Sequence, residues 1–168
     1  CSASKSYKGG SLSAMVAHFQ RNQDKISIHY IIGRDGQTVS MVPESQIAFH
    51  AKRNNLDSIG IELVNNGDGQ DSFPNVQIQS LVDLLLEILK RNQLGLLSLR
   101  GHSEVDSEYV TCGGSRIKRK QDPGDAFPWG QVLNDLRLQL QPVRMPVLIH
   151  EKSASEPKAS NTGSIFSR

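Results

Sequence analysis

The segment 101–129 carries the side chains whose types and spacing best suit chemistry. It begins Gly-His-Ser-Glu-Val-Asp and ends Arg-Lys-Gln-Asp-Pro-Gly-Asp-Ala-Phe-Pro-Trp, so His102 and Asp122 stand at opposite ends of a polar, Gly-rich stretch. An imidazole nitrogen and a carboxylate oxygen that converge in a fold are typical zinc ligands. Lys120 stands just before Asp122, and such a cation can hold an oxyanion that develops during hydrolysis. The segment therefore indicates a metal-dependent hydrolase.

Glu62 is the second candidate, because it is the single charged residue in Ser-Ile-Gly-Ile-Glu-Leu-Val at 58–64. A carboxylate in an apolar strand is costly unless it is paired, ligated or functional. With a pKa raised by burial, it would suit a general base that takes a proton from the attacking water. The alternative is a structural ion pair, just as His102 read alone is a hydrogen-bonded structural histidine and Asp122 a turn former. Their joint occurrence favours function.

The elements that must position these residues follow from hydrophobic spacing. Apolar residues at helical intervals predict helices at 12–19, 76–91 and 129–138. Alternating or continuous apolar runs predict strands at 26–32, 38–42, 58–64 and 96–100, the third of them buried on both faces. Asp35-Gly36 between the first two predicts a hairpin. Residues 103–125 lack a clear period and are predicted to be a long loop, of a length that is usually functional or disordered.

This order of elements predicts an α/β or α+β domain with a central mixed sheet flanked by helices. The catalytic domain is expected to span residues 1–141, and the Pro-, Ser- and Lys-containing stretch 142–168 is expected to be a flexible tail or linker. No apolar run approaches the roughly 20 residues of a membrane-spanning helix. The formal net charge is +2 and the charges are interspersed, which gives no Lys/Arg block of the nucleic-acid-binding type.

The motifs, taken in order, resemble the zinc-dependent N-acetylmuramoyl-L-alanine amidase family, which includes anhydromuropeptide amidases, phage lysozyme-type amidases and peptidoglycan recognition proteins. Gly-His-Ser-Glu-Val resembles the family's ligand segment, and Arg-Lys-Gln-Asp-Pro-Gly with Phe-Pro-Trp resembles its second specific motif. Ser-Ile-Gly-Ile-Glu-Leu and Val-Pro-Glu followed by Ala-Phe-His-Ala match in the same order. The matching segments are 27–36, 42–44, 48–51, 55–65, 101–105 and 119–129.

The resemblance implies a fold, a reaction and a role for each matched residue. His102 and Asp122 would be two of three Zn²⁺ ligands, and Glu62 would activate the attacking water. Lys120 would stabilise the oxyanion. His50 and Arg119 would line the substrate groove. The reaction implied is cleavage of the amide between N-acetylmuramic acid and L-alanine in peptidoglycan or muropeptides.

One departure concerns the first ligand. The family's first zinc-binding histidine ends a central strand, and the chain begins Cys1-Ser2-Ala3, the stretch that would follow that histidine. We therefore expect the first strand and the third ligand upstream of Cys1, in a fragment separated by proteolytic processing that stays docked. A lipoprotein start at Cys1 is the competing explanation, and it fits poorly because a lipidated cysteine precedes a linker.

Two other function classes remain open at this stage. One is a non-catalytic peptidoglycan-binding module that kept the groove and lost the metal. The other is an N-terminal-nucleophile hydrolase in which Cys1 attacks and its own amine is the base. Cys1 and Cys112 could form a disulfide in an oxidising compartment. That pairing and the cell-wall substrate favour a periplasmic or extracellular location, with the cytoplasm as the alternative.

Overall fold

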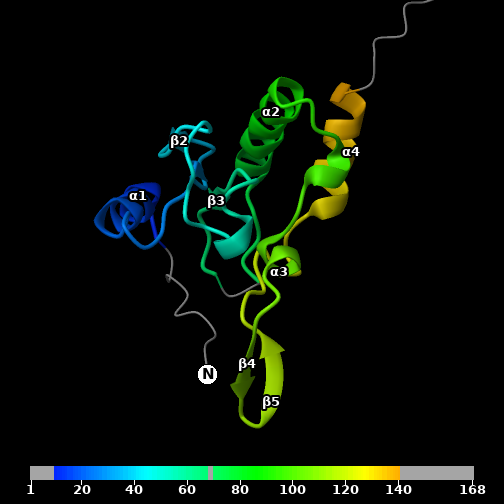
Figure 1. Cartoon of the computed structure of the whole chain (residues 1–168). Helices are drawn as coiled ribbons and strands as arrows, with labels where there is room; N and C mark the ends of the chain where they lie inside the picture. The colour runs from blue at the N-terminus through cyan, green and yellow to red at the C-terminus, as the bar shows by residue number, and fades with distance from the viewer. Residues whose placement is uncertain (1–9, 68–69, 141–168) are drawn as a thin grey trace, which may run out of the picture.

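The computed structural model describes residues 10–67 and 70–140 as a small mixed sheet between helices (Figure 1). The predicted α+β class is confirmed. In space, β1 lies between β2, its antiparallel partner, and β3, its parallel partner. The elements in chain order are α1 (Leu12–Arg21), β1 (Tyr30–Ile32), β2 (Thr38–Ser40), η1 (Lys52–Asn54), β3 (Ile61–Leu63), α2 (Asn75–Arg91), η2 (Leu96–Ser98), α3 (His102–Val105), β4 (Tyr109–Cys112), β5 (Ser115–Lys118) and α4 (Trp129–Leu140).

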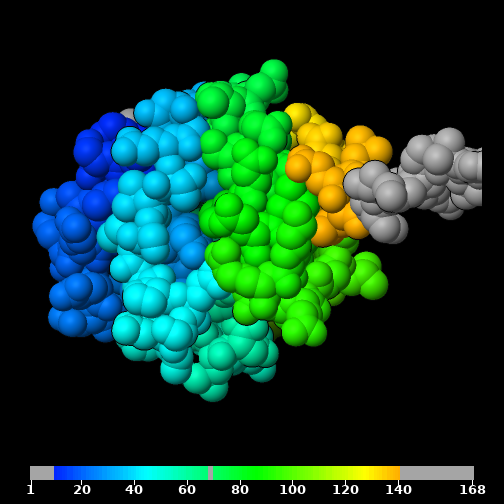
Figure 2. All heavy atoms as spheres, turned by 90° about the horizontal axis from the view of Figure 1, so that it is seen from above, coloured from blue at the N-terminus to red at the C-terminus, as the bar shows by residue number. Residues whose placement is uncertain are grey.

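The alternation of side chains along β1 divides the core between the two faces of the sheet. Ile31 packs with Met15 of α1 in a small cluster, whereas Ile32 joins the large cluster formed by α2 and α4. Seen from above, α1, the β1–β2 segment, α2 and α4 follow one another across the molecule from blue to orange (Figure 2). The sheet is therefore the middle of three layers.

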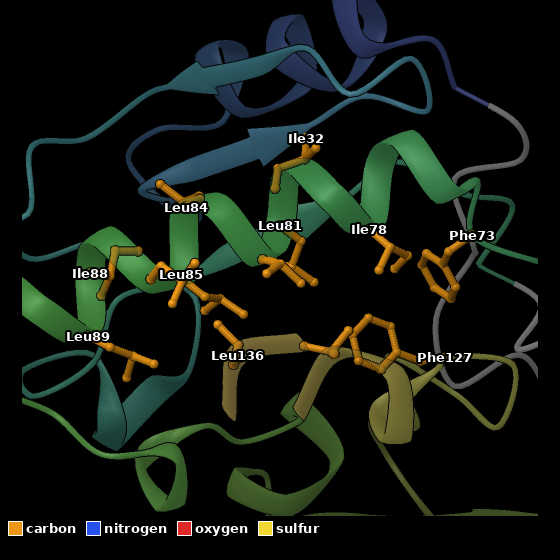
Figure 3. Packing of buried hydrophobic residues seen from close by; sticks show 13 residues of the cluster. Ile32, Phe73, Ile78, Leu81, Leu84, Leu85, Ile88, Leu89, Phe127 and Leu136 are labelled. Carbon is orange, nitrogen blue, oxygen red and sulfur yellow. The ribbon is translucent and has the colours of Figure 1, made fainter. Parts of the chain in front are cut away.

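The large core cluster is centred on the apolar stripe of α2. Figure 3 shows the side chains of Leu81 and Leu85 pointing toward Leu136 of α4, with Ile78 beside Phe73 and Phe127 at one end. The two phenylalanine rings meet edge to face with centroids 5.3 Å apart. Burial of such a continuous apolar stripe is the main force that holds α2 on the sheet and α4 against α2.

Gln77 ties α2 to the ends of two strands. Its side-chain amide is fully buried and donates to the carbonyl oxygens of Ile32 and Val64, at 3.0 Å each. These carbonyls follow the parallel pairing of β1 with β3, in which Ile31 lies opposite Glu62. Gln77 thus holds the ends of β1 and β3 together, close to the position of Glu62 on β3.

The three predicted helices and the β1–β2 hairpin are confirmed, and three other predictions are wrong. Residues 96–100 form the 3-10 turn η2 rather than a strand. β3 occupies only part of 58–64 and is partly exposed instead of buried on both faces, because it ends the order of the three-stranded sheet. The stretch 103–125 is not a loop throughout, since it contains most of α3 and the hairpin β4–β5.

Several predictions fall on residues that the structure does not describe. They concern the disulfide between Cys1 and Cys112, the catalytic role of Cys1 and the tail at 142–168. The expected upstream strand concerns residues outside this chain and stays a prediction.

Candidate functional site

The predicted site residues line one pocket beside β3. Glu62 enters it from β3, His102 from the start of α3, and Lys120 and Asp122 from the segment after β5. His50 lines the pocket from the loop that precedes η1. Segments far apart in the sequence therefore meet in one place, as the motif analysis required.

His102 and Asp122 are in direct contact. The Nδ1 atom of His102 lies 2.8 Å from Oδ2 of Asp122, and the two side chains keep 25% and 54% of their exposure. The backbone N–H of Ser103 donates to the carbonyl of Asp122 at 2.9 Å, so a backbone hydrogen bond also joins the two segments. Burial acts to raise the pKa of Asp122, but the hydrogen bond and charge of His102 outweigh it, and the pKa is lowered.

Gly101 allows the two segments to come this close. A Cβ atom at this position would lie 3.0 Å from Cδ of Pro123 and 3.5 Å from Cζ2 of Trp129. The N–H of Gly101 donates to the Glu104 carboxylate at 2.6 Å, which caps the first turn of α3. The glycine before His102 is therefore a packing requirement of the site.

Glu62 has the electrostatic character that the sequence predicted for a base. Burial raises its pKa most, and the neighbouring Asp122 carboxylate raises it further, while Lys120 and His102 lower it, which leaves the pKa at about 7. The carboxyl group is therefore in electrostatic reach of all three residues. A carboxyl with a pKa near neutrality can both accept and release a proton at physiological pH.

His50 packs against another histidine and faces the same pocket. Its Nδ1 lies 3.0 Å from the carbonyl of Ala48, and its Nε2 lies 3.1 Å from Oγ of Ser58. Burial, with smaller effects of His29 and His102, lowers the pKa of His50 despite the Ala48 hydrogen bond. His50 is therefore held neutral at the pocket wall.

His29 has a structural role behind the pocket. It is 1% exposed, and its Nδ1 accepts the N–H of Gly60 at 2.9 Å while Nε2 lies 3.1 Å from the Gln46 carbonyl. Its ring meets that of His50 edge to face at 5.5 Å. His29 thus supports the pocket from behind.

Arg119 lines the pocket, but acidic residues hold its guanidinium. One end pairs with the buried carboxylate of Asp106, and Nε lies 2.9 Å from Oε2 of Glu108. Its backbone N–H donates to the Glu108 carbonyl at 2.9 Å. These contacts make Arg119 a brace between α3, the hairpin and the site.

The donor set fits zinc in kind. An imidazole nitrogen and a carboxylate oxygen that already touch are ligands that Zn²⁺ accepts, and catalytic sites commonly use three protein ligands. Within 10–67 and 70–140, no group of three or more His, Cys, Asp or Glu side chains is placed to hold a metal ion. If zinc binds here, His102 and Asp122 would be two of its ligands.

Two supporting residues escaped the sequence analysis. Glu104 and Asp106 hold Gly101 and Arg119, respectively, through the contacts given above. Glu104 stands three residues after Gly101, the spacing of a capping box, so a signal was available. The pairing of Asp106 with Arg119 had no such signal because it depends on the fold of β4 and β5.

Comparison with known proteins settles the family. The sequence profile of the N-acetylmuramoyl-L-alanine amidases (Amidase_2) matches residues 4–125. The chain belongs to this amidase family. Among its relatives, N-acetylmuramoyl-L-alanine amidase A of Achromobacter lyticus is 27% identical over 74% of this chain and 76% of that protein. The 1,6-anhydro-N-acetylmuramyl-L-alanine amidase AmpD of Enterobacter cloacae is 32% identical over 70% of this chain.

A solved amidase structure has the same fold. The E. coli amidase AmiD, in complex with the substrate anhydro-N-acetylmuramic acid-L-Ala-D-gamma-Glu-L-Lys, superposes with a TM-score of 0.64 and 26% identity over 77% of this chain. The match spans 55% of the AmiD chain and 58% of AmpD. In the described part of this family member, no helix has both the length and the apolarity to cross a bilayer.

Proposed function

We propose that this amidase hydrolyses the bond between N-acetylmuramic acid and L-alanine in peptidoglycan or muropeptides, with Zn²⁺ as its cofactor. The observation that supports this most strongly is the contact of His102 with Asp122 in electrostatic reach of Glu62. A pair of ligand types beside a carboxyl of raised pKa suits amide hydrolysis better than a structural cluster.

His102 and Asp122 would hold the metal through the nitrogen and oxygen atoms that now face each other. When bound, Zn²⁺ supplies Lewis acidity toward the amide carbonyl and the attacking water. Zinc held by two protein ligands would be weak, so the proposal includes a third. The histidine predicted upstream of Cys1 stays a prediction for that position.

Glu62 would take the proton from the attacking water and deliver it to the leaving L-alanine nitrogen. Its raised pKa matches this double task, because a base must also be a competent acid once protonated. Lys120 would stabilise the negative charge that develops on the carbonyl oxygen. Both residues line the pocket with the metal-binding pair.

His50 would contact the substrate from the pocket wall as a neutral hydrogen-bonding group. Both His50 and Ser58 line the pocket, so a substrate group could replace Ser58 as the hydrogen-bond partner of Nε2. Arg119 would not bind the substrate through its guanidinium, because Asp106 and Glu108 already engage that group. We assign it the bracing of the substrate groove.

The second candidate function is a peptidoglycan-binding module without catalysis. The observation that favours it is the set of two, not three, metal donors among the residues described. Either function would operate where cell-wall material is met, and the periplasmic or extracellular location, with the cytoplasmic alternative, is part of the proposal.

Zinc content and muropeptide cleavage, measured on the same preparations, test the proposal. The full chain should bind zinc and release a peptide with a free L-alanine amine from anhydro-N-acetylmuramic acid-L-Ala-D-gamma-Glu-L-Lys, as detected by mass spectrometry. H102A and D122A should lose both zinc and cleavage, whereas D24N, a carboxylate removed from the exposed turn after α1, should retain both. Muropeptide binding without cleavage by the zinc-loaded chain would establish the binding module instead.

A further inference from the structure

The hairpin β4–β5 projects from the body of the molecule next to α3 (Figure 1). Its register places Tyr109 opposite Lys118 and Thr111 opposite Arg116, so these four side chains share one face. All four residues are exposed. We call them the basic hairpin face.

This face has a uniform sign of charge. Residues 109–118 include Arg116 and Lys118 and contain neither Asp nor Glu. The guanidinium carbon of Arg116 lies 4.5 Å from the centroid of the Tyr109 ring, a cation–π contact that holds the guanidinium over an aromatic surface. The ring and the two cations therefore form one surface suited to acidic groups on a polymer.

A short chain of contacts joins the basic hairpin face to the catalytic pocket. Nζ of Lys118 donates to the carbonyl of Ser103 at 2.6 Å, and the N–H of Ser103 donates to the carbonyl of Asp122. The pocket wall itself reaches the hairpin at Ile117. Ile117 alternates to the face opposite Arg116 and Lys118, so a ligand that leaves the pocket would reach the basic hairpin face at its Lys118 edge, which contacts Ser103.

We propose that the basic hairpin face binds acidic stem peptides of a peptidoglycan strand, next to the stem that occupies the pocket. This inference rests on the proposed function. The γ-linked glutamate named in the AmiD substrate leaves its α-carboxyl free, so each stem of such a polymer is anionic. Arg116 and Lys118 complement these carboxylates, and Arg can pair with one through two parallel hydrogen bonds. The preferred substrate is therefore the polymer rather than a single soluble muropeptide.

Co-sedimentation of the full chain with insoluble peptidoglycan stripped of attached phosphate polymers tests this. R116A/K118A should pellet about fivefold less than the wild type at low salt, the effect of two exposed charge contacts of a few tenths to 1 kcal/mol each. R21A/K25A removes the same charge from α1 and the turn after it and should pellet like the wild type. R116K/K118R keeps the charge and should retain binding, and added salt should weaken the wild type.

Peptidoglycan whose carboxyl groups have been amidated identifies the partner group. Wild-type pelleting should fall to that of R116A/K118A on this material. Unchanged pelleting of R116A/K118A, an equal loss in R21A/K25A, or full binding to amidated peptidoglycan would each overturn the proposal. Cleavage of the soluble muropeptide should be within about twofold of wild type in R116A/K118A. If neither the wild type nor any variant cleaves the soluble muropeptide, the proposed function is rejected, and the pelleting comparison remains valid.

Discussion

The pKa values of two glutamates in this chain are shifted in opposite directions by their surroundings. Glu44 accepts from Nε of Arg91 at 3.0 Å and from the Tyr30 hydroxyl at 2.6 Å, and the Arg91 hydrogen bond leads a set of contacts that lower its pKa to about 2. Glu62 lies on β3, where burial and the nearby Asp122 carboxylate raise its pKa to about 7 despite the opposing charges of Lys120 and His102.

The difference teaches what each carboxylate contributes. Glu44 links the loop before η1 to α2 and to β1, so its charge is used for stability. Glu62 keeps its charge poorly at neutral pH, a costly state in a fold and a useful one for proton transfer. The experiments below separate these two roles.

Glu62→Gln should give the largest effect. Removing the titrating group while keeping the shape should lower kcat for the soluble muropeptide by about 10²–10⁴-fold, the usual contribution of a general base. Thermal stability should not fall, because the substitution replaces a carboxylate whose charged form is disfavoured at this position by a neutral amide. A kcat within about threefold of wild type would remove Glu62 from the chemistry.

Lys120→Met should lower kcat by about 10²–10³-fold through loss of oxyanion stabilisation. The substitution should also raise the pKa of Glu62 and so widen its difference from the pKa of Glu44, because Lys120 lowers the pKa of Glu62 in the folded protein. Carbon-13 NMR of the carboxyl groups in the metal-free protein measures this shift. A pKa of Glu62 that falls in K120M would contradict the assigned electrostatics.

Glu44→Gln should act on stability and leave kcat near that of the wild type. We expect a loss of about 1–2 kcal/mol at pH 7, reduced from the ideal pair because Arg91 is partly exposed. The pKa of Glu44 is lowered on folding, so its stabilisation is present above the ordinary value of 4.5 and is lost as the pH falls toward 2. Urea unfolding at several pH values should therefore show a flatter acid limb in E44Q.

Tyr30→Phe should give the smallest effect. It removes the 2.6 Å hydrogen bond to Glu44 and the 3.3 Å hydrogen bond that Nη2 of Arg91 donates to the hydroxyl, and it leaves the Arg91–Glu44 contacts in place, which should cost about 0.5–1.5 kcal/mol. The pKa of Glu44 should rise slightly, because the hydroxyl contributes to its lowering. Equal losses in Y30F and E44Q would mean that Arg91 contributes little to the pairing.

The sequence predicted local elements of the fold better than contacts between distant segments. The helical stripe of α2 and the Asp-Gly turn between β1 and β2 are local signals, and both were confirmed. The β4–β5 hairpin also had one, since Gly113 and Gly114 adopt positive φ between two short strands, but the weak apolar alternation of those strands concealed it. The Glu44–Arg91 pair spans 47 residues of sequence, and no local pattern predicts such a contact.

The convergence of His102 and Asp122 was expected from the motifs, but the way Gly101 and Ser103 support it was not. Close approach of two backbone segments depends on packing in three dimensions, which spacing along the chain does not encode. The same reason explains why the pairing of Arg119 with two acidic residues was not expected from the sequence.

Anomalous X-ray scattering at the zinc absorption edge, from crystals of the zinc-loaded full chain, tests the central claim most directly. The account predicts one strong peak between Nδ1 of His102 and Oδ2 of Asp122, on the side of the pocket that Glu62 faces, and its loss in D122A crystals. A zinc-loaded crystal with no peak there, in which His102 and Asp122 remain hydrogen bonded to each other, would contradict it.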